Sequence, residues 1–448
     1  MKRAWRWPFA GFVVGALVGA TILTVNVVGA SSPERPPAGA GSFGEILHTP
    51  VLLARAGEPV ELRYDVVCGA SQEEPRAACS PQGSVFVRPE GRSTFVEHPL
   101  ARDHSGLLSA TVPEDEARFG FDYYAELENG RGQTAHLPEG AASAPHHAWP
   151  LRSWTTVVLD EPFRGTRAPD SVAGSFAWGK GEHALGLDSG REQSRIGPSA
   201  FDVAPDGSLV VLDQANRQLV GVRGGERSEL PIAFAGGEGD LAVAHDGTIY
   251  VLDAGGAAPS VAAYTPAGDL IAETPLAEPS ADMVRAGPSG PIVHAYPSEM
   301  WLPTGAGRPP LAPNEQIAGA QAARTFGDGV AVVVSASPDE ARLALVRGDS
   351  VLHTWLLRSS TSLGEVQLAE PFGDGLLAVV RLWNEKRAEF RVVRLTPDGS
   401  AESFSVDRAE WAETASLSRF RLHGETLYQL RSTASGVEIA TFEIGGTS

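Results

Sequence analysis

The sequence is poor in the residue types that mark redox, metal-binding and nucleic-acid-binding proteins. Its 448 residues include two cysteines, and 36 basic residues are outnumbered by 55 acidic ones, for a formal net charge of −19. Such an acidic balance argues against nucleic acid or an anionic bilayer surface as the partner, because the field of the protein repels phosphates. The charge therefore excludes the commonest polyanionic partners.

The motifs of common enzyme classes are also missing. The sequence has no G-x-S-x-G nucleophile elbow, no H-E-x-x-H zinc motif, no P-loop and no C-x-x-C pair. It lacks the alternating Asp pattern with a distal Glu that forms a calcium loop. Its Asp-Gly dipeptides lie between alternating apolar residues, where turn geometry explains them. These absences lower the expectation of catalysis without removing it, and we expect no metal and no cofactor.

A single apolar run is long enough to cross a membrane. It covers residues 8–30 and follows a basic segment at residues 1–7. As a helix it would reach about 34 Å, and a hydrocarbon core is about 30 Å thick. The favoured interpretation is a retained single-pass anchor with residues 1–7 in the cytoplasm and the bulk of the chain outside it. The alternative is a signal peptide cleaved after Val28–Ala30, which would make the protein secreted.

A flexible linker and a small all-β domain are expected next. Residues 31–41 are rich in Pro, Gly and Ser. Over residues 42–150, apolar and polar residues alternate in candidate strands at Val60–Val67, Ser84–Val87, Thr94–Glu97, Gly106–Thr111 and Phe121–Leu127. The cluster Tyr123-Tyr124-x-Glu126 with Gly130-x-Gly132 resembles the late strands of immunoglobulin-like or fibronectin type III-like modules. This resemblance implies a β-sandwich.

The cysteines and a histidine pair belong to this domain. Cys68 and Cys79 are eleven positions apart in the exported region, where two cysteines most simply form one disulfide. We expect the disulfide to stabilise this domain alone, because its core should be separate from that of the domain after it. His146 and His147 mark the junction and are interpreted as solvent-exposed linker residues, with half of a metal site as the alternative.

A repeat runs through the rest of the chain. Phe201–Gln214 and Leu241–Ala254 are aligned copies of a strand, an Asp-Gly turn and a second strand. The turn glycine recurs at intervals of 39 to 49 residues as Gly207, Gly247, Gly290, Gly329, Gly375 and Gly424. This spacing is typical of four-stranded propeller blades and predicts a six-bladed β-propeller over residues 155–448. Either Thr155–Leu159 or Gly174–Trp178 would supply the strand missing from the last unit.

A family resemblance accompanies the repeat. Trp178–Val220 resembles the NHL-type propellers of bacterial secreted proteins in its Trp-Gly-x-Gly-Glu entry, Gly197-Pro198-Ser199, and Leu212-Asp213 with Asn216-Arg217. The resemblance covers roughly residues 170–448 as architecture. In that family the matching positions are mostly structural, so the resemblance implies a fold and no active site. Its members bind proteins, nucleic acid or small ligands, and a minority are enzymes.

One position of the repeat carries charge in five of six units. Five residues before the glycines stand Asp202, Ala242, Arg285, Arg324, Glu370 and Arg419. If these residues lie on inner strands, the three arginines would hold an anionic group by bidentate hydrogen bonds. The alternative, favoured because buried arginine is rarely unpaired, is that Asp202 and Glu370 form ion pairs with them between blades.

These features predict an all-β protein with an N-terminal membrane helix, a small sandwich and a propeller. We expect a membrane-anchored extracytoplasmic binding or scaffold protein whose partner is an unknown protein or a small anionic ligand, and not nucleic acid. The alternative is a propeller enzyme, such as a metal-dependent lactonase or a lyase.

Overall fold

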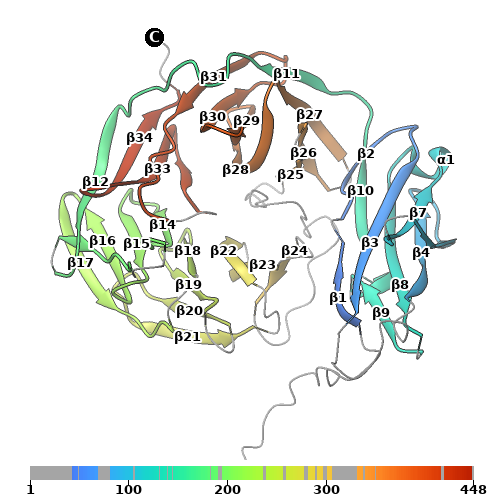
Figure 1. Ribbon diagram of the computed structural model, residues 1–448, viewed down its shortest axis with the longest axis horizontal. Helices are drawn as coiled ribbons and strands as arrows, with labels where there is room; N and C mark the ends of the chain where they lie inside the picture. The colour runs from blue at the N-terminus through green and yellow to red at the C-terminus, as the bar shows by residue number, and fades with distance from the viewer. Residues whose placement is uncertain are drawn as a thin grey trace, which may run out of the picture. The chain divides into compact units, whose positions relative to one another are not determined.

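The computed structural model describes most of the chain from Phe43 to Gly445. Its gaps are residues 49, 69–80, 104–105, 131, 139, 144, 182, 190–193, 236–238, 256–258, 277–280, 288–289, 296–299, 305–329, 337–338, 349 and 415–417. The regular secondary structure of the described part is almost entirely β, with one short α-helix, α1 (Glu114–Ala117) (Figure 1). None of its helices is long and apolar enough to cross a membrane. The predicted anchor at residues 8–30 and the predicted linker lie outside the described residues.

Two sheets form a β-sandwich at the N-terminal end of the described chain. One sheet has the order β1 (Phe43–Leu47), β3 (Val60–Cys68), β7 (Leu108–Val112), β6 (Ala101–Arg102). The other has the order β2 (Leu53–Arg55), β10 (His146–Leu151), β8 (Phe121–Glu128), β4 (Gln82–Pro89), β5 (Val96–Pro99), with β9 (Thr134–Leu137) also on β8. Burial alternates strictly along β8, so one face of this strand packs inward. Side chains of both sheets share one hydrophobic core.

The interpretation of His146 and His147 as exposed linker residues is wrong. Both lie on β10, where the apolar pattern continues through Trp149 to the end of the strand. His146 is buried in the sandwich core, and Nδ1 of His147 is 2.7 Å from Oδ1 of Asp122 on β8. The described residues contain no group of three or more potential metal ligands of the His, Cys, Asp and Glu types. The two histidines are therefore parts of a strand.

The Cys68–Cys79 disulfide stays a prediction. Cys68 ends β3, and Cys79 lies outside the described residues. We expect mass analysis of the native protein without reduction to find the two cysteines joined, because the predicted export would bring the chain into an oxidising compartment. Closing this loop should stabilise the protein by up to about 3 kcal/mol. Two thiols that react with an alkylating reagent under denaturing conditions would contradict the pairing.

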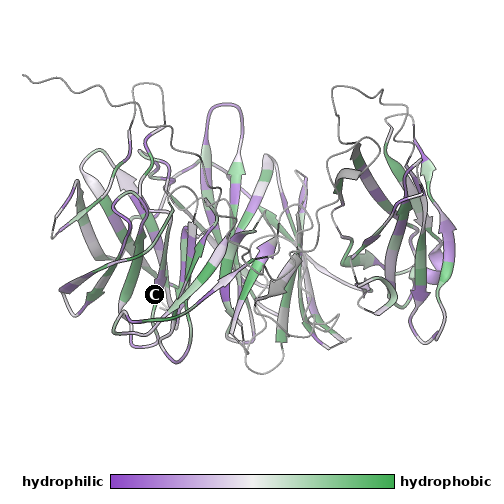
Figure 2. Ribbon diagram, turned by 90° about the horizontal axis from the view of Figure 1, so that it is seen from below, coloured by the Kyte–Doolittle hydropathy of each residue, from purple (hydrophilic) through white to green (hydrophobic). Residues whose placement is uncertain are grey.

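The chain after Trp154 forms a β-propeller. Its described strands make six sheets (Figure 1). From the inner to the outer strand of each sheet, they are β14 (Ala200–Val203), β15 (Leu209–Asp213), β16 (Gln218–Arg223), β17 (Glu226–Pro231); β18 (Gly239–Val243), β19 (Ile249–Asp253), β20 (Ser260–Tyr264), β21 (Leu270–Pro275); β22 (Ala281–Gly287), β23 (Gly290–Ala295), β24 (Met300–Pro303); β25 (Val330–Ala336), β26 (Glu340–Arg347), β27 (Ser350–Ser359), β11 (Thr155–Leu159); β28 (Ser362–Phe372), β29 (Gly375–Trp383), β30 (Ala388–Leu395), β31 (Ala401–Val406); and β32 (Phe420–His423), β33 (Thr426–Thr433), β34 (Gly436–Glu443), β12 (Ser171–Trp178), β13 (Ala184–Leu185). Hydrophobic residues gather on the strands (Figure 2) and fill the spaces between neighbouring sheets.

Both candidate closing strands are used, in different sheets. β12 pairs antiparallel with β34, with Val172 opposite Ala440. The start of the propeller thus completes the sheet formed by its end. β11 pairs parallel with β27, with Val157 opposite Leu357, and supplies the outer strand of a sheet whose other described strands are β25, β26 and β27. Each added strand covers an edge that would otherwise expose unpaired backbone groups.

The fourth unit of the repeat is tested only in part. The glycine spacing places Gly329 between the first and second strands; β25, which begins at Val330, is the innermost strand of its sheet among the described residues, and residues 305–329 lie outside them. The tetrapeptide Phe-Gly-Asp-Gly occurs at 326–329 and again at 372–375, and the second copy does join β28 to β29. The first copy lies outside the described residues.

The sandwich and the propeller each have a hydrophobic core of their own, and a further cluster joins them. One hydrophobic cluster combines Leu53 and Trp149 of the sandwich with Trp301 and Val333 of the propeller. The Trp149 indole nitrogen donates a hydrogen bond to the carbonyl oxygen of Gly348, at 3.2 Å. Residues 38–448 accordingly form one compact unit. Loss of stability in the sandwich should therefore extend to the adjoining sheets.

Candidate functional site

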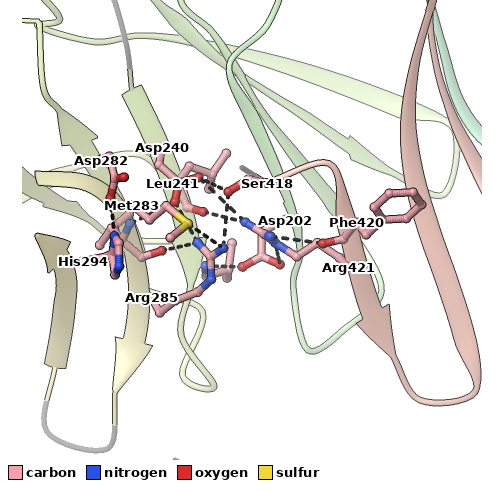
Figure 3. Close-up of polar contacts among 12 residues, drawn as sticks. Asp202, Asp240, Leu241, Asp282, Met283, Arg285, His294, Ser418, Phe420 and Arg421 are labelled. Carbon is pink, nitrogen blue, oxygen red and sulfur yellow. Dashed lines mark hydrogen bonds and ion pairs between the residues drawn. The ribbon is translucent and has the colours of Figure 1, made fainter. Parts of the chain in front are cut away.

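Polar side chains of four sheets meet at the inner strands of the propeller (Figure 3). We call this group the inner-strand cluster. Its members are Asp202 on β14, Asp240 on β18, Arg285 on β22, Arg421 on β32, and Ser418, which precedes β32. Each is at most 7% exposed. The inner strands of neighbouring sheets contact one another, and successive side chains of a strand point to opposite faces of its sheet, so residues of neighbouring sheets meet here.

Asp240 lies at the centre of the inner-strand cluster. Its Oδ2 accepts hydrogen bonds from Nη1 of Arg285 at 2.7 Å and from the backbone N–H of Val284 at 2.9 Å. Its Oδ1 accepts one from the hydroxyl of Ser418, and Nη2 of Arg421 is 3.8 Å away. One carboxylate thus links three sheets of the propeller, those that contain β18, β22 and β32.

Asp202 forms the second ion pair. Its Oδ1 accepts a hydrogen bond from Nε of Arg421 at 3.1 Å, and its Oδ2 accepts one from the backbone N–H of Val243 on the next sheet at 2.8 Å. The other two nitrogens of Arg421 donate to the carbonyls of Phe420 and Leu241. The first and last sheets, which are far apart in sequence, are therefore joined through Asp202 and Arg421.

The charges of the cluster cancel. Two carboxylates face two guanidinium groups, and each carboxylate also accepts a backbone N–H of the following sheet. Buried ions are tolerated when they are paired and their remaining donors and acceptors are satisfied. This arrangement holds four sheets in register, and its acids and bases are already engaged with one another.

The predicted site residues do not assemble as expected. Asp202 and Arg285 belong to the inner-strand cluster, but Arg419 forms an ion pair with Glu410 and lies over the ring of Phe390. Glu370 is buried on β28, and Arg324 lies outside the described residues. Arg285 and Arg419 thus pair with Asp240 and Glu410, and not with Asp202, while a pair between Glu370 and Arg324 stays a prediction.

Arg421 was missed because of a two-residue error in the repeat alignment. Glu370 is opposite Leu377 and Arg421 is opposite Tyr428, each two residues before the last pair of its hairpin. Gly424 is thus the equivalent of Gly373 and not of Gly375. The sequence contained this signal, since two glycines stand in the turn at 372–375. Asp240 lies seven residues before Gly247 and Ser418 lies six before Gly424, so the charged position five residues before the glycines includes neither of them.

Comparisons with known proteins assign neither a family nor an activity. No protein-family profile matches the chain, and no curated protein sequence matches it. The chain is similar to the solved structure of virginiamycin B lyase from Staphylococcus aureus at 9% identity, a TM-score of 0.36 and coverage of 77% of this chain and 94% of that one. It is similar to aldose sugar dehydrogenase from Streptomyces coelicolor at 12% identity and a TM-score of 0.38, covering 62% and 99%. A protein of unknown function from Bacteroides thetaiotaomicron has 10% identity and a TM-score of 0.37, covering 91% and 99%.

Proposed function

We propose that this protein is a membrane-anchored extracytoplasmic binding protein. In this proposal an immunoglobulin-like sandwich adjoins a six-bladed, NHL-type propeller that presents its loops to a ligand or a partner protein. The observation that carries the proposal is the inner-strand cluster, in which the charged groups at the centre of the ring are bound to one another. Binding through loops requires such a rigid ring, whereas catalysis at the centre would require groups free to react.

The membrane topology can be tested directly. We expect the full-length protein to remain in the membrane fraction after a high-salt wash, because an apolar run of residues 8–30 is long enough to span the bilayer. Protease added outside the cytoplasmic membrane should digest the sandwich and propeller and leave the N-terminal segment protected. A soluble mature protein that begins near Ser31 would instead show that the run is a cleaved signal peptide.

The enzyme alternative makes a different prediction. A metal-dependent lactonase would retain about one divalent ion per chain through dialysis, held by three or more side chains. Elemental analysis of the purified protein measures this content. A stoichiometric ion would contradict the binding-protein proposal, and its loss on substitution of the responsible side chains would locate the site.

A further inference from the structure

Arg419 has an incompletely satisfied buried guanidinium group. Its side chain is 4% exposed, and it forms an ion pair with Glu410. Its terminal nitrogens donate long hydrogen bonds of 3.4 and 3.3 Å to the carbonyls of Arg408 and Thr414. Its Nε has no hydrogen-bond partner among the described residues. Buried donors almost always have an acceptor, because leaving one without a partner destabilises the fold, so such a group calls for an explanation.

Two further arginines lie beside it. The Arg419 guanidinium carbon is 5.3 Å from the centre of the Phe390 ring. Arg381 on β29 is directly opposite Phe390 on β30, and side chains of such a pair lie on the same face of the sheet. Arg408 forms an ion pair with Glu410, the same carboxylate that Arg419 uses. We call Arg381, Arg408 and Arg419 the arginine cluster.

The arginine cluster is short of negative charge. Within the described part of the chain, the Arg381 side chain forms no hydrogen bond or ion pair, and the carboxylate of Glu410 is shared by Arg408 and Arg419. Burial, with Arg408 and Arg381 nearby, lowers the pKa of Arg419 to about 9. Burial and Arg381 also lower the pKa of Arg408. Glu365, an exposed residue on β28, acts on Arg419 in the opposite direction. Like charges are thus held together in a protein that is acidic overall.

We propose that the arginine cluster binds a small oxyanion, the carboxylate or phosphate group of a soluble ligand. The anion reaches the site past Arg408, whose side chain is 47% exposed, and takes hydrogen bonds from Arg381 and Arg419. Guanidinium groups bind both kinds of oxyanion by paired, charge-assisted hydrogen bonds. The inference rests on the proposed binding function and gives that function a ligand class. It places the site between the sheets that contain β29 and β32, away from the inner-strand cluster.

Calorimetry on the detergent-solubilised full-length protein tests the site with inorganic phosphate and with succinate, each at matched ionic strength. We expect one of the two anions to bind, which identifies the group recognised, and Arg381→Gln to weaken that binding at least tenfold. The unliganded Arg381→Gln protein should unfold at no lower temperature than the wild type, because Arg381 makes no ion pair with any described residue. Glu410→Gln, which removes the competing carboxylate, should not abolish binding.

Arg223→Gln is the matched control, since Arg223 is an arginine on β16 whose side chain is 79% exposed beside Asp206. Equal weakening by Arg223→Gln and Arg381→Gln would show non-specific attraction and would overturn the proposal. So would the absence of heat and of thermal stabilisation with both anions in the wild type. Neither result touches the membrane topology, so the site can fail while the proposed extracytoplasmic function stands.

Discussion

Replacing Asp240 with alanine should lower the free energy of unfolding by about 3–5 kcal/mol, the usual cost of leaving one member of a buried ion pair without its partner. The substitution would leave the Arg285 guanidinium and the Val284 N–H, now bound to Asp240 at 2.7 and 2.9 Å, without this acceptor. It would also remove the acceptor of the Ser418 hydroxyl. Equilibrium unfolding in urea, followed by circular dichroism, measures the loss.

Two variants separate the contributions of charge and hydrogen bonding. Asp240→Asn keeps an oxygen that accepts from the Val284 N–H but removes the charge that faces Arg285. This variant should therefore lose some unfolding free energy, but less than Asp240→Ala. Asp206→Ala is the control, because Asp206 pairs with an Arg223 side chain that is 79% exposed, and such pairs contribute at most about 1 kcal/mol. Equal losses for Asp240→Ala and Asp206→Ala would show that the inner-strand cluster does not stabilise the ring.

The sequence was sufficient for the class of fold because the signals were local. Asp206-Gly207 and Asp246-Gly247 are hairpin turns as predicted, with both glycines at positive φ, +82° and +85°. An Asp-Gly pair between alternating apolar residues is decided by turn geometry within a few residues. The β-strands on either side follow from the same short pattern.

The arrangement of strands into sheets was not local and was harder to predict. β11 pairs with β27 across about 200 residues, and no pattern within either strand identifies its neighbour. The candidate site had the same difficulty. Arg421 meets Asp202 only because β32 and β14 belong to neighbouring sheets at the point where the ring closes. A repeat alignment that is wrong by two residues therefore still predicts the fold correctly, but it assigns the wrong residues to the site.

Acid should destabilise the sandwich strongly because it buries two neutral histidines. Burial lowers the pKa of His48 to about 4 and, with His48 nearby, that of His146 to about 3, from 6.5. Above pH 6.5 both residues are neutral in the folded and in the unfolded chain, so they add no pH dependence to the free energy of unfolding. Below pH 6.5 the unfolded chain takes up protons that the folded one does not, so stability falls by about 1.4 kcal/mol per pH unit for each histidine. Between pH 7.5 and pH 5 the two together should remove about 4 kcal/mol.

The pH dependence can be assigned to these residues by substitution. The rings of His48 and His146 are 5.9 Å apart, and Nδ1 of His146 has no hydrogen-bond partner in the described part of the chain. His146→Leu therefore removes a titrating group without removing a hydrogen bond from that atom, and it should abolish about half of the loss between pH 7.5 and pH 5. His136→Leu is the matched control, because His136 lies on β9 with its side chain 39% exposed and should leave the loss unchanged. Urea unfolding at the two pH values measures each variant.

If His146→Leu loses as much stability in acid as the wild type, the buried pair is not the origin of the effect. The protonation of carboxylates would then cause the loss of stability, and the loss should be concentrated below pH 5, where these groups begin to bind protons.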